Sequence, residues 1–145
     1  MADAVKLSCA TCGQMNRVAA DRLAAGPKCG ACGDPLLDGR VIEFDAAGHD
    51  KATRGDELPL LVDYWAPWCG PCRAMAPEFV KAAKALQGRA RLAKLNTEDN
   101  PQIAQRARIQ GIPALVLYRR GREVARLAGA RPASEIVAFV QNNLG

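Results

Sequence analysis

Two cysteines three positions apart, Cys69 and Cys72, stand where the chain is expected to change from strand to helix. The preceding run, residues 60–65, is short and apolar like a buried strand, and apolar residues recur at helical spacing after Cys72. The free N–H groups and positive dipole end of a helix N-terminus favour a thiolate on the first cysteine. We therefore predict that Cys69 attacks disulfide sulfurs and that Cys72, one turn inside the helix, resolves the mixed disulfide.

Four further cysteines form two C-x-x-C pairs, Cys9 with Cys12 and Cys29 with Cys32, separated by sixteen residues. A glycine follows each pair, which lets the backbone turn back through a positive φ at low cost. This spacing is typical of a zinc site with four thiolate ligands. The sequence thus predicts one structural Zn²⁺ with no open coordination position for a substrate.

Two other interpretations of the N-terminal cysteines stay open. They could act as extra redox dithiols, or the segment could bind nucleic acid as many zinc ribbons do. Residues 1–37 carry four basic and three acidic side chains and no aromatic residue, which disfavours the second alternative.

The composition sets the broad class of the protein. A chain of 145 residues, 49% of them hydrophobic, suffices for one packed domain and a small appendage. The net charge is +5, with basic residues spread along the sequence, and we interpret them as a solvated surface rather than a nucleic-acid site.

Residues 1–6 lack the apolar core of a signal peptide, and no apolar run is long enough to cross a membrane. We expect a cytoplasmic monomer without membrane or nucleic-acid partners, its cysteines reduced or bound to metal.

The order of the expected elements indicates an α/β fold. Turn-forming residues at 34–39 place a boundary near residue 37, between a zinc-ribbon-like module, residues 1–37, and a second domain, residues 38–145. Strands are expected at 41–44, 60–65, 91–96, 114–118 and 123–127, and helices within 46–57, from Cys72 to Leu86, at 102–108 and from Pro132 onward. This order predicts a mixed central sheet with helices on both faces. Pro77 should kink the long helix, and His49 is expected to be solvated.

Asp63 is an anomaly within the apolar run 60–65. A buried carboxylate is costly unless its proton is useful, so Asp63 either lies on a solvated strand face or has a pKa raised into the range of acid–base work. The two tryptophans that flank the site also differ in their expected roles. Trp65 is expected to pack in the core and Trp68 to form part of a contact surface beside the nucleophile.

The segment Val62-Asp63-Tyr64-Trp65-Ala66-Pro67-Trp68-Cys69-Gly70-Pro71-Cys72 closely resembles the active site of the thioredoxins. The resemblance covers residues 38–145 and implies the thioredoxin fold and the activity of a general protein-disulfide reductase. Gly70 and Pro71, between the cysteines, resemble the reducing members of that group. Arg73 stands where many relatives have lysine. With the two N-terminal cysteine pairs, the whole chain resembles the second, zinc-binding type of bacterial thioredoxin.

The resemblance also implies roles for residues outside the cysteine pair. Asp63 would lie behind the cysteines and help to move the proton of the resolving thiol, and Lys94 would lie near that carboxylate. An X-Pro bond is usually trans, but by resemblance Pro113 is a cis-proline that leaves the neighbouring backbone free to pair with an extended substrate strand. The implied substrate surface comprises Trp68, Gly70, Pro71, Ile112, Pro113 and Gly129.

The resemblance further implies partners. A flavin-containing, NADPH-dependent thioredoxin reductase would re-reduce the protein, which would pass electrons to enzymes such as ribonucleotide reductase or methionine sulfoxide reductase. One rival hypothesis makes the chain a zinc-ribbon interaction or chaperone-like module whose second domain docks clients. Another makes the ribbon a stress sensor, because oxidation of its thiolates would eject the metal and alter activity.

Overall fold

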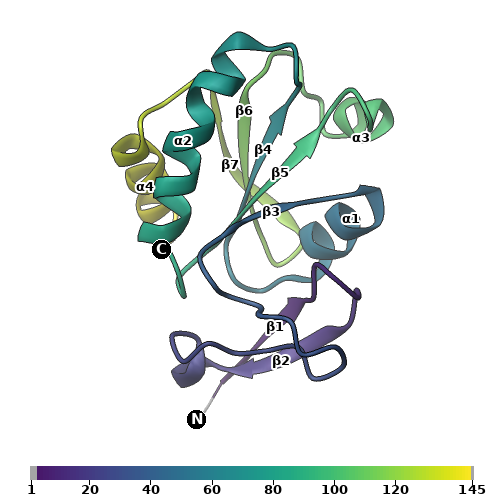
Figure 1. Cartoon of the computed structure of the whole chain (residues 1–145), viewed down its shortest axis with the longest axis vertical. Coiled ribbons are helices and arrows are strands. Elements are labelled where there is room, and N and C mark those ends of the chain that lie inside the picture. Colours follow the sequence, from purple (N-terminus) through teal and green to yellow (C-terminus); the bar gives the residue numbers. More distant parts are fainter. Residues whose placement is uncertain (1–2, 145) are drawn as a thin grey trace.

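The computed structural model describes residues 3–144, which form a small β-hairpin module beside a larger α/β domain (Figure 1). In the module, β1 (Ala4–Ser8) pairs antiparallel with β2 (Met15–Ala19), and a short 3-10 helix, η1 (Ala20–Arg22), follows. Each C-x-x-C pair lies in a turn outside these strands. The module thus consists of one hairpin and two cysteine-bearing turns.

The larger domain is built on a five-stranded sheet in the order β3-β5-β4-β6-β7. Strands β3, β5 and β4 run parallel, and β6 and β7 are antiparallel additions. The strands and helices are β3 (Val41–Glu43), α1 (Ala46–Gly55), β4 (Leu60–Trp65), α2 (Gly70–Ala85), β5 (Arg91–Asn96), α3 (Pro101–Arg106), β6 (Ala114–Arg119), β7 (Arg122–Ala128) and α4 (Ala133–Asn142). The prediction of a mixed central sheet with helices on both faces is confirmed.

The two faces of the sheet carry separate hydrophobic layers. Helices α2 and α4 cover one face, where Phe79 and Ile136 pack with Leu61 and Leu115. Helices α1 and α3 cover the other face, over a layer that includes Tyr64. Alternate residues of β4 therefore enter opposite layers, and each large side chain stabilises the fold by about 1.5–3 kcal/mol when fully buried.

Helix α1 is more regular and more buried than the sequence suggests. The carboxylate of Asp45 accepts a hydrogen bond from the N–H of Gly48 and caps the helix. The prediction that His49 is solvated is wrong, because its side chain faces the sheet and its Nε2 lies 2.7 Å from the hydroxyl of Tyr64. Few residues of α1 are apolar, so its inner face is not evident from hydrophobic spacing.

A buried ion pair joins the module to the larger domain. Asp56 follows α1, and its carboxylate lies 2.6 Å from Nη1 of Arg91, the first residue of β5. The same carboxylate accepts hydrogen bonds from the N–H and the hydroxyl of Ser8, at 2.8 and 2.9 Å. Ser8 immediately precedes Cys9 in the chain, so the ion pair anchors the end of β1 that leads into the first cysteine turn.

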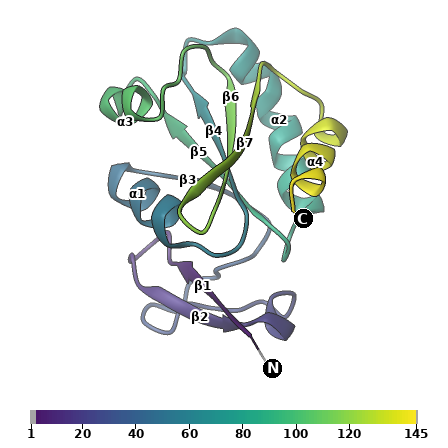
Figure 2. The same cartoon turned by 180° about the vertical axis from the view of Figure 1, so that it is seen from behind.

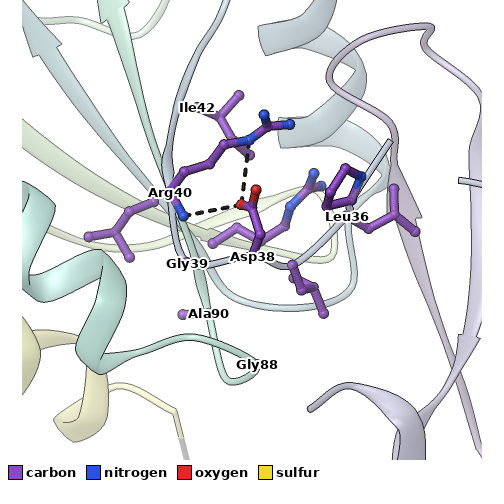
Figure 3. A pocket seen from close by; sticks show the side chains of 11 residues that line it. Leu36, Asp38, Gly39, Arg40, Ile42, Gly88 and Ala90 are labelled. Carbon is purple, nitrogen blue, oxygen red and sulfur yellow. Dashed lines mark hydrogen bonds and ion pairs between the residues drawn. The ribbon is translucent and has the colours of Figure 1, made fainter. Parts of the chain in front are cut away.

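The linker forms a second contact between the two parts. Residues 36–40 run past Gly88 and Ala90, at the turn between α2 and β5 (Figure 3). Here Asp38 and Arg40 form an ion pair with 3.4 Å between Oδ1 and Nε, and both side chains are exposed. The exposed Asp38–Arg40 pair can therefore be compared with the buried Asp56–Arg91 pair.

We predict that Asp56→Ala lowers the free energy of unfolding by about 3–5 kcal/mol, because it leaves the guanidinium of Arg91 buried without a counter-charge. Urea denaturation followed by circular dichroism measures the effect. Asp38→Ala, which removes the exposed pair, is the matched control and should cost less than about 1 kcal/mol. Equal losses in the two variants would contradict the assigned role of the buried pair.

Candidate active site and metal centre

The Cys69–Cys72 pair lies at the N-terminus of α2. The two sulfurs form a disulfide, and the Cα atoms are 5.3 Å apart. Cys69 is the N-cap of α2, and its Sγ accepts a hydrogen bond from the N–H of Cys72 at 3.2 Å. No acidic residue lies in the first turn of the helix, so its amides and dipole favour negative charge on the Cys69 sulfur.

The first cysteine is less accessible than its place at a helix N-terminus suggests. Cys69 is only 5% exposed, because Trp65 and Ile112 pack against the cysteine pair. Trp68 beside it is 67% exposed. Gly70 and Pro71 are exposed as well. An approaching disulfide would therefore meet the tryptophan and the start of α2 before it reaches the sulfur.

A loop before β6 faces the cysteine pair. The Ile112–Pro113 bond is cis, as the resemblance implies, and the carbonyl oxygen of Ile112 lies 3.8 Å from Sγ of Cys69. The N–H of Gly129 donates to the carbonyl of Pro113 at 3.0 Å and joins the start of β6 to the end of β7. Within residues 3–144, the N–H of Ile112 has no hydrogen-bond partner. This free amide is available to an extended chain laid beside the loop.

Asp63 lies in β4, behind the cysteine pair. It is 4% exposed, which excludes a solvated strand face, and its Oδ1 has no hydrogen-bond partner in the part of the chain that the structure describes. Burial raises the pKa of Asp63 to about 7, although the positive charge of Lys94 acts in the opposite direction. Asp63 and Cys72 line the same cavity, of about 160 Å³, which offers a proton a route between them.

Lys94 lies across from Asp63 in the pairing of β4 with β5. Its Nζ is 3.4 Å from a carboxylate oxygen of Glu43 and 4.8 Å from the centre of a Trp65 ring. The ammonium group is therefore held beside the cavity by a carboxylate and a ring face. Sequence reasoning missed Glu43, which the parallel register of β3 and β5 places opposite Lys94.

The four N-terminal cysteines come together in the module. Their sulfurs lie within 4.8 Å of one another, with Cys9 to Cys32 and Cys12 to Cys29 at 3.6 Å. Each turn closes through an N–H of the glycine after the pair, and both glycines have a φ of +82°. A tetrahedral Zn²⁺ with Zn–S distances of about 2.3 Å would separate its sulfurs by about 3.8 Å. The donor set and its spacing fit zinc.

The fold and the cysteine pair place this chain among the dithiol–disulfide oxidoreductases. Residues 40–142 match the family profile described as Thioredoxin, and residues 8–34 match the profile described as Thioredoxin 2, N-terminal. The chain belongs to the thioredoxin family, with the N-terminal zinc ribbon of the thioredoxin 2 type. It is accordingly an oxidoreductase that reduces protein disulfides.

Individual relatives agree with this assignment. Thioredoxin C-3 of Corynebacterium nephridii is 39% identical over 136 residues, which cover 94% of this chain and 93% of that protein. A thioredoxin of Synechocystis sp. is 40% identical over 98 residues, or 68% of this chain and 92% of its own length. The crystal structure of chloroplastic thioredoxin z superimposes with a TM-score of 0.65 at 29% identity and covers 71% of this chain and 93% of that one.

We predict that Asp63→Asn stabilises the oxidised protein at alkaline pH. The folded carboxyl keeps its proton up to about pH 7, whereas an unfolded Asp loses it near pH 4, so the stability due to the bound proton is lost as the pH rises between these values. At pH 9 the variant should gain on the order of 4 kcal/mol in free energy of unfolding, and little at pH 3.

Urea denaturation at both pH values tests this prediction. Asp99→Asn, at an exposed position, is the control and should show no such difference between the two pH values. A gain for Asp63→Asn that is the same at pH 3 and pH 9 would contradict the raised pKa.

Proposed function

We propose that Cys69 is the attacking thiolate and Cys72 the resolving thiol of a general reductase of protein disulfides. The observation that carries this assignment is the position of the Cys69 sulfur. It caps α2 and accepts a hydrogen bond from the N–H of Cys72, and it lies beside the carbonyl oxygen of Ile112. Of the two sulfurs, the Cys69 sulfur is the one that accepts a hydrogen bond from a helix N–H group and lies next to the loop that an extended substrate would contact.

The proposed reaction has two displacement steps. The Cys69 thiolate attacks one sulfur of a substrate disulfide, forms a mixed disulfide and expels the other substrate sulfur as a thiolate. The Cys72 thiol then gives its proton to the carboxylate of Asp63 through their shared cavity, and its sulfur attacks the Cys69 sulfur and expels the second substrate sulfur as a thiolate. The two substrate thiolates take up one proton from Asp63 and one from solvent. Cys69 and Cys72 keep the disulfide, so two electrons have passed to the substrate.

Substrate recognition in this proposal rests on backbone pairing and one apolar contact. An extended chain would pair with the free amide of Ile112, beside Pro113 and Gly129. Exposed Trp68, with Gly70 and Pro71, would contact the residues around the substrate disulfide. Lys94 would act as a positioning residue that sets the charge around Asp63. Such a surface recognises the backbone of the substrate more than its side chains, which suits a reductase with many substrates.

Family membership supports the proposed electron partners. A flavin-containing, NADPH-dependent thioredoxin reductase would reduce the Cys69–Cys72 disulfide, and ribonucleotide reductase or methionine sulfoxide reductase would be among the acceptors. We also propose a cytoplasmic location, where a reducing environment keeps the four ribbon cysteines available as metal ligands.

We further propose that Cys9, Cys12, Cys29 and Cys32 hold one structural Zn²⁺. Four protein ligands leave no position for substrate or water, so the ion would supply folding energy to the module and no chemistry. The small apolar cluster of the module, which includes Leu7 and Leu36, supports this role because it is too limited to fold such a segment alone.

We predict that Cys69→Ser lowers the rate of insulin-disulfide reduction by at least about 100-fold, because serine cannot supply the attacking thiolate. The assay uses a thiol reductant and follows the turbidity of reduced insulin, and circular dichroism verifies that the variant is folded. Activity that survives this substitution would favour the rival interpretation of a client-docking module.

We predict that wild-type protein contains stoichiometric zinc and that Cys9→Ser loses it. Without the metal, amides of β1 and β2 should exchange with solvent at least about 10-fold faster, whereas insulin reduction should change by less than about threefold. Metal analysis, hydrogen exchange and the insulin assay measure these three quantities. Protected strands in a metal-free variant would contradict the structural role of zinc.

A further inference from the structure

A second groove shares no lining residue with the active site. It lies on the face of the sheet covered by α1 and α3, between these helices and β7, with a volume of about 360 Å³. Figure 2 shows the β6–β7 hairpin reaching toward α1 on this side of the molecule. The volume lies within the usual range of small-molecule sites.

Arginines from three separate elements line this groove. They are Arg54 from α1, Arg106 at the end of α3, Arg108 in the turn after α3, and Arg126 from β7, so residues spread over 73 positions of the sequence meet here. The groove also contains two carboxylates, Asp50 and Glu123. Four cations against two anions leave a net charge of +2 in one concave surface.

Both carboxylates are already paired. Asp50 lies 2.5 Å from Nη2 of Arg106, and Glu123 holds Arg126 through two contacts of 2.6 Å. Within residues 3–144, neither Arg54 nor Arg108 has a carboxylate within 4.0 Å. Two guanidinium groups in the groove are therefore free to bind an anion.

Hydrogen bonds hold the turn that carries Arg108. Its φ is +58°, in the left-handed region where glycine costs less than any residue with a Cβ. Arg126 donates to the carbonyl oxygens of Ala107 and Arg108 at 2.9 and 3.2 Å and fixes this turn. The helix dipole favours cations at the C-terminal ends of α1 and α3, which accounts for Arg54 and Arg106 singly. Arg108, just beyond the C-cap of α3, adds a third cation to the same side of the groove.

The floor of the groove is a directed chain of hydrogen bonds. The hydroxyls of Tyr118 and Tyr64 are 2.6 Å apart, and Nδ1 of His49 lies 3.0 Å from Asp50. Burial lowers the pKa of His49, so the ring is neutral, and the carboxylate of Asp50 places the single ring proton on Nδ1. Nε2 then accepts from Tyr64, which in turn accepts from Tyr118. Tyr118 lines the groove, and its oxygen keeps a free lone pair that can accept a hydroxyl proton from a ligand.

We propose that this groove binds a small phosphate ester that also carries hydroxyl groups, such as a sugar phosphate or a nucleoside phosphate. The planar forks of Arg54 and Arg108 match phosphate oxygens, and a ligand hydroxyl donates to Tyr118. The site involves none of the residues assigned to disulfide reduction, so it stands or falls independently of the reductase mechanism.

Titration calorimetry of the full chain with ribose 5-phosphate, glucose 6-phosphate and AMP tests the proposal, with adenosine and a short oligothymidylate as comparisons. We expect saturable binding of at least one of the three esters and none of adenosine. Arg54→Gln and Arg108→Gly should each weaken that binding at least about tenfold, the loss expected for one charge-assisted contact. Arg108→Gly also relieves the backbone strain, so its loss of binding cannot reflect unfolding.

Arg22→Gln removes an equal charge outside the groove and is the matched control, which should bind as the wild type does. All of these variants should reduce insulin at the wild-type rate, which separates failure of this proposal from failure of the reductase mechanism. The proposal would be overturned if no phosphate ester bound, or if only the oligothymidylate bound. It would also be overturned if Arg22→Gln and Arg108→Gly bound the ester with equal affinity.

Discussion

The hydrogen bonding of β4 to a strand on each side is the constraint on which the active site depends. On one side it pairs with β5, and on the other it pairs with β6, where Tyr64 lies opposite Ala114. Cys69 follows the end of β4 by four residues, and Pro113 immediately precedes β6. One register therefore sets the distance between the nucleophilic sulfur and the substrate loop. A slip of this register would separate the two halves of the site and also turn the apolar residues of β4 to the wrong layers.

Two buried aspartates show how the same side chain serves stability in one place and chemistry in another. Asp56 is surrounded by the guanidinium of Arg91 and two hydrogen bonds from Ser8, so its charge is balanced and it joins the module to the domain. Asp63 has a half-exposed lysine as its nearby cation and an unpartnered oxygen. Its ionised form is therefore unstable, and this instability gives a carboxyl group that exchanges a proton near neutral pH.

Local sequence signals were sufficient for most of the fold and for the two cysteine sites. The apolar runs, the turn residues and the C-x-x-C spacings are short-range features, and each predicted strand and helix has a counterpart in the structure. The features that sequence reasoning missed depend on contacts between distant segments. His49 is buried because α1 packs on β4 and β6. Cys69 is shielded by Ile112, 43 positions away. The basic residues look scattered along the chain, yet the fold brings four arginines into one groove.

Trapping of the mixed disulfide tests the central claim, the division of labour between Cys69 and Cys72, most directly. The Cys72→Ser variant, reduced and then mixed with a peptide that contains a disulfide, should accumulate a covalent adduct, because the resolving thiol is missing. Mass spectrometry of a digest should place the peptide on Cys69, and the Cys69→Ser variant should form little adduct under the same conditions. A stable adduct on Cys72 in Cys69→Ser, with none on Cys69 in Cys72→Ser, would contradict the assigned roles.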